Sequence, residues 1–207
     1  MIARGLCLIL SLFLAAPALA EVSAYAGGAV QVVSKATLGP RQKAGFAKFR
    51  ARAKDFHGVY YISKAGDKGS FWVDEHRLED AKTYAKAACE EQGAGPCMLY
   101  AQILPAGAPK GRGPLVKGIN ASLSRDLIRH SGKGDPGTFG AAAVNRMGQN
   151  GMGWGYESRE RARKEALFTC IKGIDRQVFK DQVSAQVYNQ AVSQGRFDCR
   201  LVAEFRK

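Results

Sequence analysis

Two stretches of the chain share one pattern: GVYYISKAGDKGSFW at residues 58–72 and GAAAVNRMGQNGMGW at residues 140–154. Three glycines and a tryptophan recur with a displacement of 82 residues, and four helix-type residues recur further on with a displacement of 81. The matched positions are Gly58, Gly66, Gly69, Trp72, Glu79, Ala81, Ala85 and Cys89 with Gly140, Gly148, Gly151, Trp154, Glu160, Ala162, Ala166 and Cys170. A repeat of this length spans a whole supersecondary unit, so the sequence predicts two tandem units.

Each unit has the pattern of a β-hairpin followed by a helix and a third strand. In the first unit, the β-branched and aromatic run 59–62 and the apolar run 71–73 flank a glycine-containing turn. Small apolar residues then recur at helical spacing over 77–90, and an apolar strand follows at 97–104. The second unit repeats this order, with strands at 141–144, 153–156 and 199–205 and a helix that begins after Ser158.

These patterns predict an α+β fold of two β-β-α-β units, over residues 40–105 and 138–207, with antiparallel strands and helices on one face. The sequence leaves open whether the units share one sheet or form two lobes. A flexible arm is expected over 21–39 and a linker with a short helix over 106–137. An inserted amphipathic helix is expected over 175–194. Its apolar residues lie four apart, at Phe179, Val183, Val187 and Ala191.

A helix is also expected from Pro40, because proline suits the first helical turn. Phe46 and Phe49 give it apolar positions, and basic residues surround them. Two interpretations stay open: a helix packed on the sheet of the first unit, which is favoured, or a helix that lies on a membrane surface.

Residues 1–20, MIARGLCLILSLFLAAPALA, have the pattern of a secretory signal peptide. Arg4 supplies the basic region, residues 6–16 the apolar core, and residues 18–20 a small-x-small cleavage site. The apolar run is shorter than the roughly 20 residues that a spanning helix needs, so a retained membrane anchor is the less favoured alternative. We therefore expect a periplasmic or secreted mature chain that begins at Glu21 and has no transmembrane segment.

Four cysteines remain once Cys7 is removed with the leader: Cys89, Cys97, Cys170 and Cys199. An even number in an exported chain indicates disulfides. Three connectivities are possible, and the repeat favours Cys89–Cys97 with Cys170–Cys199. Cys89 and Cys170 occupy matching positions, while Cys97 and Cys199 each begin an apolar strand. A zinc site is poorly supported, because neither pair has the close C-x-x-C spacing.

The chain is strongly basic, with 31 Lys and Arg against 18 Asp and Glu and a formal net charge of +13. Removal of the leader takes away only Arg4 and leaves a charge of +12. Such a surface favours anionic partners: phosphorylated lipid headgroups, wall polymers or an acidic protein face. A basic surface with no dedicated ligand is the alternative. Nucleic acid is not expected as a partner, because the chain is exported and carries no nucleic-acid-binding motif.

Two sets of segments resemble a known group of proteins. GWGYESRERARKEALFTC at 153–170 and DCRLVAEF at 198–205 resemble small secreted bacterial proteins with a domain of unknown function. FHGVYYISKAGDKG at 56–69 and AACEEQGAGPCMLYAQILP at 87–105 are similar to the form of this unit in alphaproteobacterial exported proteins. The resemblance implies the tandem fold and its disulfides. It implies no catalytic, cofactor or metal residue, because that family has no established chemistry.

Few residues fit a recognisable chemical motif. The three histidines, His57, His76 and His130, lie in different elements without metal-ligand spacing, so surface or structural roles are favoured. The glycine-containing segments 66–69 and 148–151 are expected as turns rather than phosphate loops, because each lies between two strands.

Three acids, Glu75, Glu79 and Asp80, lie close together in the sequence and could supply a carboxylate pair. Acids at the start of a helix ordinarily complement the helix dipole, and that interpretation is favoured. No catalytic, cofactor-binding or metal-binding residue is therefore predicted.

Aromatic residues are the best candidates for a ligand site. Trp72 and Trp154 occupy equivalent hairpin strands, with Phe71 and Tyr156 beside them. The favoured interpretation is packing in the core beneath each helix. The functional alternative is a paired aromatic platform for a glycan or a peptide.

Charge, cysteines and the lack of catalytic motifs favour a non-catalytic envelope protein that binds an anionic component or another exported protein. The alternatives are an inhibitor whose basic loops block the acidic active site of an envelope hydrolase, or, less favoured, a wall-active enzyme.

Overall fold

The computed structural model describes residues 22–25, 27–53, 56–107, 115–116, 118–174, 180 and 184–207. The expected leader lies outside the described residues, as do Phe179 and Val183 of the expected inserted helix. None of the helices in the described ranges is long and apolar enough to cross a membrane.

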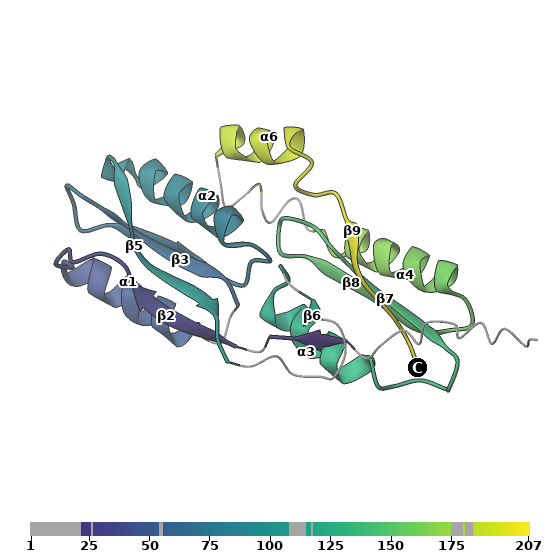
Figure 1. Cartoon of the computed structure of the whole chain (residues 1–207). Helices are drawn as coiled ribbons and strands as arrows, with labels where there is room; N and C mark the ends of the chain where they lie inside the picture. The colour runs from purple at the N-terminus through teal and green to yellow at the C-terminus, as the bar shows by residue number, and fades with distance from the viewer. Residues whose placement is uncertain are drawn as a thin grey trace, which may run out of the picture.

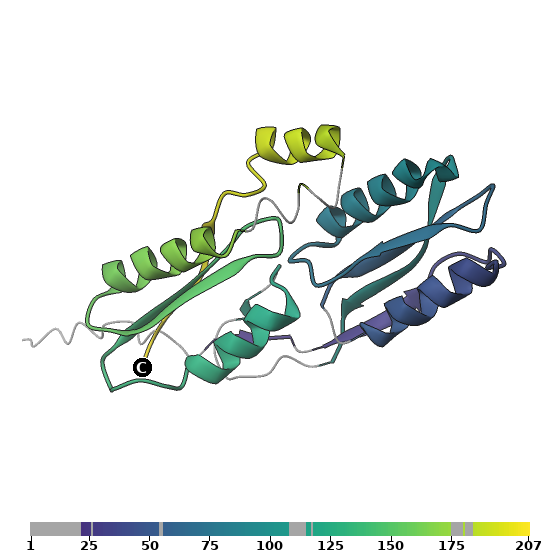
Figure 2. The ribbon, with the colours of Figure 1, turned by 180° about the vertical axis from the view of Figure 1, so that it is seen from behind.

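The described residues form two lobes that lie side by side (Figures 1 and 2). The first lobe has a four-stranded antiparallel sheet in the order β2-β5-β3-β4, and the second has a three-stranded antiparallel sheet in the order β8-β7-β9. The strand bounds are β2 Gly28–Val32, β3 Gly58–Ser63, β4 Gly69–Trp72, β5 Cys97–Pro105, β7 Phe139–Val144, β8 Asn150–Tyr156 and β9 Arg200–Arg206. The α+β class is confirmed, and the units form two sheets rather than one.

Both sheets are covered by helices on both faces, so the expectation of helices on one face is wrong. Helices α2 and α4 lie on one side of the molecule and α1 and α3 on the other, while α6 lies above the junction of the lobes (Figure 1). The helix bounds are α1 Pro40–Ala51, α2 Leu78–Cys89, α3 Ala121–His130, α4 Arg159–Lys172 and α6 Ala185–Ser193. A five-residue π-helical turn, Glu90–Ala94, follows α2.

The central strand of each lobe explains the double cover. In β3, Val59 and Tyr61 pack with α2, while Tyr60 and Ile62 pack with α1. Every residue of β3 is buried. Because successive side chains of a strand point to opposite faces, a strand that is apolar throughout needs a helix on each side.

The expected flexible arm contains two strands instead. Strand β2 pairs with β5 along its whole length, and β1, Ser23–Ala24, pairs in parallel with β6, Leu115–Val116. Val22 and Ala24 lie in the core of the second lobe. The mixture of small and apolar residues over 21–39 favoured a flexible arm. That expectation is wrong because β1 and β2 pair with β6 and β5, which gives their backbone groups hydrogen-bond partners.

Helix α1 packs on the sheet, as the favoured interpretation of the Pro40 segment holds. Phe49 is fully buried, and the Phe46 ring lies 5.8 Å from that of Tyr60 between ring centroids. The hairpin turn caps the helix, because Asp67 accepts hydrogen bonds from the backbone N–H groups of Arg41 and Gln42. The orientation of α1 on the first lobe is therefore fixed at its N-terminus.

The two predicted disulfides are confirmed. Cys89 is bonded to Cys97 and Cys170 to Cys199, each with a Cα–Cα distance of 6.2 Å. Cys89 is the last residue of α2 and Cys97 the first of β5, while Cys170 lies in the last turns of α4 and Cys199 immediately precedes β9. Of the inserted helix expected over 175–194, the described part contains α6 at Ala185–Ser193, with Ser184 as its N-cap and Ala191 buried.

Candidate functional site

The most distinctive site is a crevice where the two lobes meet. A cavity of about 460 Å³ is lined by residues 71–75 at the end of β4, by residues 147–149 in the β7–β8 turn and by Arg52 after α1. An apolar cluster beside it joins Tyr84 of the first lobe to Met147 and Phe197 of the second, with Trp72 packed against them. The crevice is thus built from both lobes.

A buried ion cluster fixes the lobes at this junction. Asp80, which is 1% exposed, accepts hydrogen bonds from Arg146 Nη2 at 2.6 Å and Arg196 Nη1 at 3.3 Å. Arg196 also donates to the Tyr84 hydroxyl at 3.0 Å. Because both arginines belong to the second lobe and Asp80 to the first, separation of the lobes would break both ion pairs.

Glu75 is the buried acid among the residues that line the cavity. Its carboxyl is 2% exposed, and Oε1 accepts a hydrogen bond from Trp72 Nε1 at 2.5 Å. Burial raises the pKa of the Glu75 carboxyl to about 8, partly offset by the Trp72 hydrogen bond. At neutral pH the protein therefore holds a protonated acid in the crevice.

The suggested trio of acids is divided among three environments. Glu75 is buried in the crevice, Asp80 is paired with arginines, and Glu79 is exposed on α2 and bonded to Lys82. Glu79 and Asp80 both lie in the first turn of α2, where the favoured interpretation expects acids, whereas Glu75 precedes the helix.

The histidines occupy three separate positions. His76 is buried, with Nδ1 accepting from the Asn120 backbone N–H at 2.7 Å and Nε2 donating to the Gln149 carbonyl at 3.0 Å. Burial lowers the pKa of His76 to about 4. His57 Nδ1 lies 3.2 Å from the Glu75 carbonyl, while the His130 ring stacks on Trp154. His76 is thus a structural link between the lobes.

The four candidate aromatic residues do not form one platform. Phe71 and Trp72 line the crevice between the lobes. Trp154, 44% exposed, lines a separate cavity of about 340 Å³ between α3 and β8, and Tyr156 lines a third hollow. Trp72 packs on the Tyr84 ring at a centroid distance of 5.2 Å, as the core interpretation expects, but that interpretation is wrong for the exposed Trp154.

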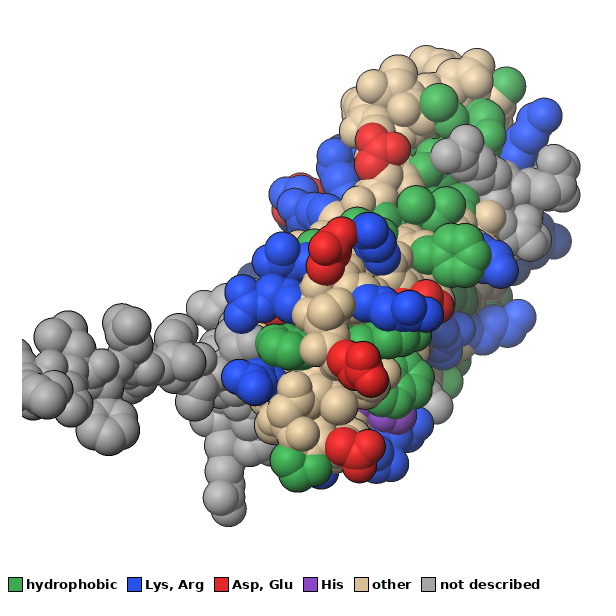
Figure 3. Space-filling view, turned by 90° about the vertical axis from the view of Figure 1, so that its right-hand side faces the viewer, with side chains coloured by type: hydrophobic (Ala, Val, Ile, Leu, Met, Phe, Trp, Pro, Cys, Tyr) green, Lys and Arg blue, Asp and Glu red, His purple; other side chains and the backbone are tan. Residues whose placement is uncertain are grey.

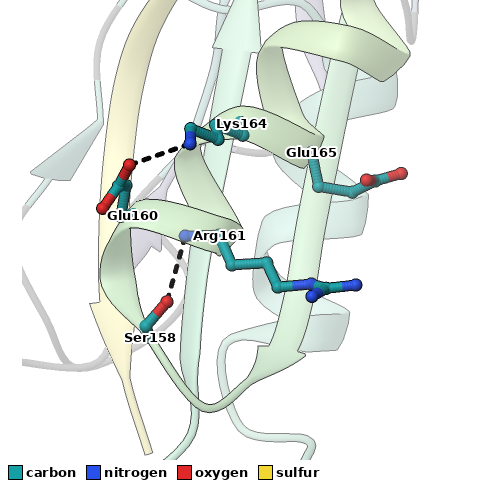
Figure 4. Close-up of a pocket in the computed structure, with 5 residues that line it drawn as sticks. All are labelled: Ser158, Glu160, Arg161, Lys164 and Glu165. Atoms are coloured by element: carbon teal, nitrogen blue, oxygen red, sulfur yellow. Dashed lines mark hydrogen bonds and ion pairs between the residues drawn. The ribbon is translucent and has the colours of Figure 1, made fainter.

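A hollow on α4 has a simpler explanation than ligand binding (Figure 4). Ser158 accepts a hydrogen bond from the Arg161 backbone N–H, which confirms it as the N-cap, and Lys164 pairs with Glu160 one turn away. These are contacts within the first turns of the helix. They leave no buried polar group directed into the hollow.

The two helices α1 and α4 differ in how their charges are matched. Helix α1 has no acidic residue, and four of its bases are exposed and take part in no ion pair in the described part of the chain. These bases are Arg41, Lys43, Lys48 and Arg50. On α4, Arg159 and Arg163 both pair with Glu204, and basic and acidic side chains are interspersed over that end of the molecule (Figure 3).

Within the described ranges, no three His, Cys, Asp or Glu side chains come together in a group that could hold a metal ion. The chain matches no family model, no curated protein and no solved structure. Its function is therefore inferred from its own residues and their geometry.

The sequence did not indicate Glu75, Gln149 or the Asp80 cluster as parts of one site. One signal was available: an acid follows the second strand of each hairpin, at Glu75 and Glu157. Only the first of these faces the other lobe and is buried.

Proposed function

We propose that this chain is an exported, non-catalytic binding protein that docks on an anionic component of the bacterial envelope through the solvent face of α1. Export is supported by the leader pattern of residues 1–20 and by two disulfides, which persist in oxidising compartments. The resemblance to secreted bacterial proteins and the proposed tandem repeat agree with this role.

The unpaired charge on α1 is the observation that carries the proposal. Residues seven apart lie on the same side of a helix, so Arg41 with Lys48 and Lys43 with Arg50 form two basic rows. The small exposed residues Ala44 and Ala47 lie between the basic residues of these rows. Long cationic side chains flanked by alanines can reach a flat polyanionic surface without steric hindrance.

The same helix is unsuited to insertion into a membrane. Its large apolar residues, Phe46 and Phe49, pack inward on the sheet, where their rings contact those of Tyr60 and Tyr100. Attraction through α1 is therefore electrostatic, and each base contributes about 1 kcal/mol near an anionic surface at low salt.

The test is co-sedimentation of the mature protein with purified wall sacculi and, separately, with anionic phospholipid vesicles over a salt series. A variant with Arg41, Lys43, Lys48 and Arg50 replaced by glutamine should lose at least about tenfold in binding to the favoured fraction. The matched control replaces four bases of α4, Arg159, Arg163, Lys164 and Lys172, and should change binding far less.

Both variants remove the same formal charge, so the comparison separates a dedicated surface from overall charge. Equal losses in the two variants would reject α1 as the docking surface. No binding of the wild-type protein to either fraction at low salt would reject the proposal as a whole.

A further inference from the structure

The crevice between the lobes contains buried polar atoms that the protein itself leaves unused. Oε1 of Glu75 is bonded to Trp72, but Oε2 is buried and has no hydrogen-bond partner in the described part of the chain. Oε1 of Gln149, from the other lobe, is also buried and lacks a partner there. Both residues line the cavity of about 460 Å³. The cavity is thus lined by a residue from each lobe that has a buried oxygen without a partner among the described residues.

A buried oxygen without a hydrogen-bond partner destabilises the protein, and a ligand with N–H donors would supply the missing partner. Trp72 and Met147 are among the residues that line this cavity, and an aromatic ring attracts cations. Around this cavity Asp74 and Arg52 carry opposite charges, and the raised pKa of Glu75 keeps its carboxyl protonated at neutral pH in the free protein. The negative charge that the cavity can gain is that of Glu75, when a bound cation displaces its proton.

We propose that the crevice binds a small organic cation with an ammonium or guanidinium group, whose N–H donors pair with Oε2 of Glu75 and Oε1 of Gln149. The cavity volume is in the usual range for small-molecule sites. This site lies apart from the solvent face of α1 and goes beyond the envelope-docking function.

Binding of a cation has a consequence for the Glu75 proton. In the free protein, burial and the nearby Asp80 and Asp74 raise the pKa of Glu75, while the Trp72 hydrogen bond and Arg196 lower it, and the result is about 8. A bound cation favours the carboxylate, so the proton on Glu75 passes to solvent as the ligand enters. At neutral pH, binding should release close to one proton per ligand.

Trp72 provides a direct spectroscopic probe. The indole N–H of Trp72 donates to Glu75, whereas Trp154 lies in a different cavity. In an NMR spectrum the Trp72 indole N–H signal therefore reports on the crevice, and the Trp154 signal is an internal control. Titration with butylammonium at neutral pH should move the Trp72 signal to saturation and leave the Trp154 signal in place. The neutral isostere 1-butanol should move neither.

Two variants and one control test the contacts. Glu75→Gln keeps an oxygen for Trp72 but removes the charge, and should weaken butylammonium binding by about tenfold or more. Gln149→Ala keeps Glu75 and should weaken butylammonium binding less than Glu75→Gln does. This second variant tests the site even if Glu75→Gln does not fold. Glu157→Gln, at the exposed equivalent position, should bind as wild type. Calorimetry in two buffers of different ionisation enthalpy should show the proton released.

The proposal is overturned if butylammonium leaves the Trp72 signal unmoved, as expected of a crevice that holds only water. It is also overturned if 1-butanol has the same effect as butylammonium. Undiminished binding by a folded Glu75→Gln variant, or by Gln149→Ala where Glu75→Gln does not fold, would place the ligand elsewhere.

Discussion

The two lobes have the same order of hairpin, helix and disulfide-linked strand, yet they are packed with side chains of very different size. The central strand of the first lobe is Val59-Tyr60-Tyr61-Ile62, and that of the second is Ala141-Ala142-Ala143-Val144. In the first lobe, the Phe46 and Phe49 rings of α1 stack on the Tyr60 ring. In the second lobe, helix α4 lies directly on β8, with glycine where a side chain would stand.

The matched glycines show what this difference means. A Cβ at Gly151 would lie 2.1 Å from the Cys170 backbone nitrogen, so glycine is required there by the backbone of α4. At Gly69, the equivalent position, a Cβ would meet the Tyr60 hydroxyl at 2.6 Å. The same sequence signal thus allows a close helix in one lobe and a large ring in the other.

The largest effect is expected from Gly151→Ala. Because the new Cβ would overlap backbone atoms of α4, we expect a loss of about 3 kcal/mol or more in the free energy of unfolding, measured by urea denaturation. Gly66→Ala, in the turn of the first lobe, is the control, since its Cβ meets only the Ser63 hydroxyl at 3.4 Å. Similar losses in both variants would contradict the close packing of α4.

The lobes also differ in the burial of the acid that follows the hairpin. Glu75 is buried in the first lobe, and its equivalent Glu157 is exposed in the second. The folded-state pKa of Glu75 is about 8, above its ordinary value of 4.5, so between these values the folded chain holds a proton that the unfolded chain has lost. The free energy of unfolding therefore falls as pH rises through this range. Glu75→Gln removes this slope and should be more stable than wild type at alkaline pH by on the order of 2 kcal/mol.

Glu157→Gln is the control for that series and should keep the wild-type slope, because Glu157 is exposed. His76 has its folded-state pKa lowered from 6.5 to about 4, so its contribution to stability is lost as pH falls below 6.5. That loss is common to wild type and both variants and cancels in the comparison. An unchanged slope in Glu75→Gln would mean that Glu75 is ionised in the folded protein.

The smallest expected effect concerns the disulfides. Cys89–Cys97 spans 8 residues and Cys170–Cys199 spans 29, so loop entropy gives the second bond about 1 kcal/mol more stabilisation. Replacing each pair by alanine and comparing urea midpoints measures the difference. A larger loss from the shorter loop would mean that packing at Cys89 outweighs chain entropy.

Local patterns predicted much of the fold, and contacts between distant residues account for most of what was missed. Tyr60 and Tyr61 in an apolar run, the glycine turns, and alanines at helical spacing each express a preference that neighbours along the chain determine. Glu75 and Gln149 lie 74 residues apart, and Asp80 and Arg196 lie 116 apart, so no spacing rule connects them. Strand β2 was missed because its residues are mostly exposed and show no clear apolar alternation.

The path of the chain has a consequence for the order in which the lobes are completed during synthesis. The sheet of the first lobe needs nothing beyond Pro105, whereas the core of the second lobe joins Val22 and Ala24 to Phe205 on the last strand. A chain that emerges from its N-terminus can therefore finish the first lobe early. Val22 and Ala24 can be fully packed only after Phe205 has been synthesised. Core residues near the N-terminus are therefore among the last to be buried.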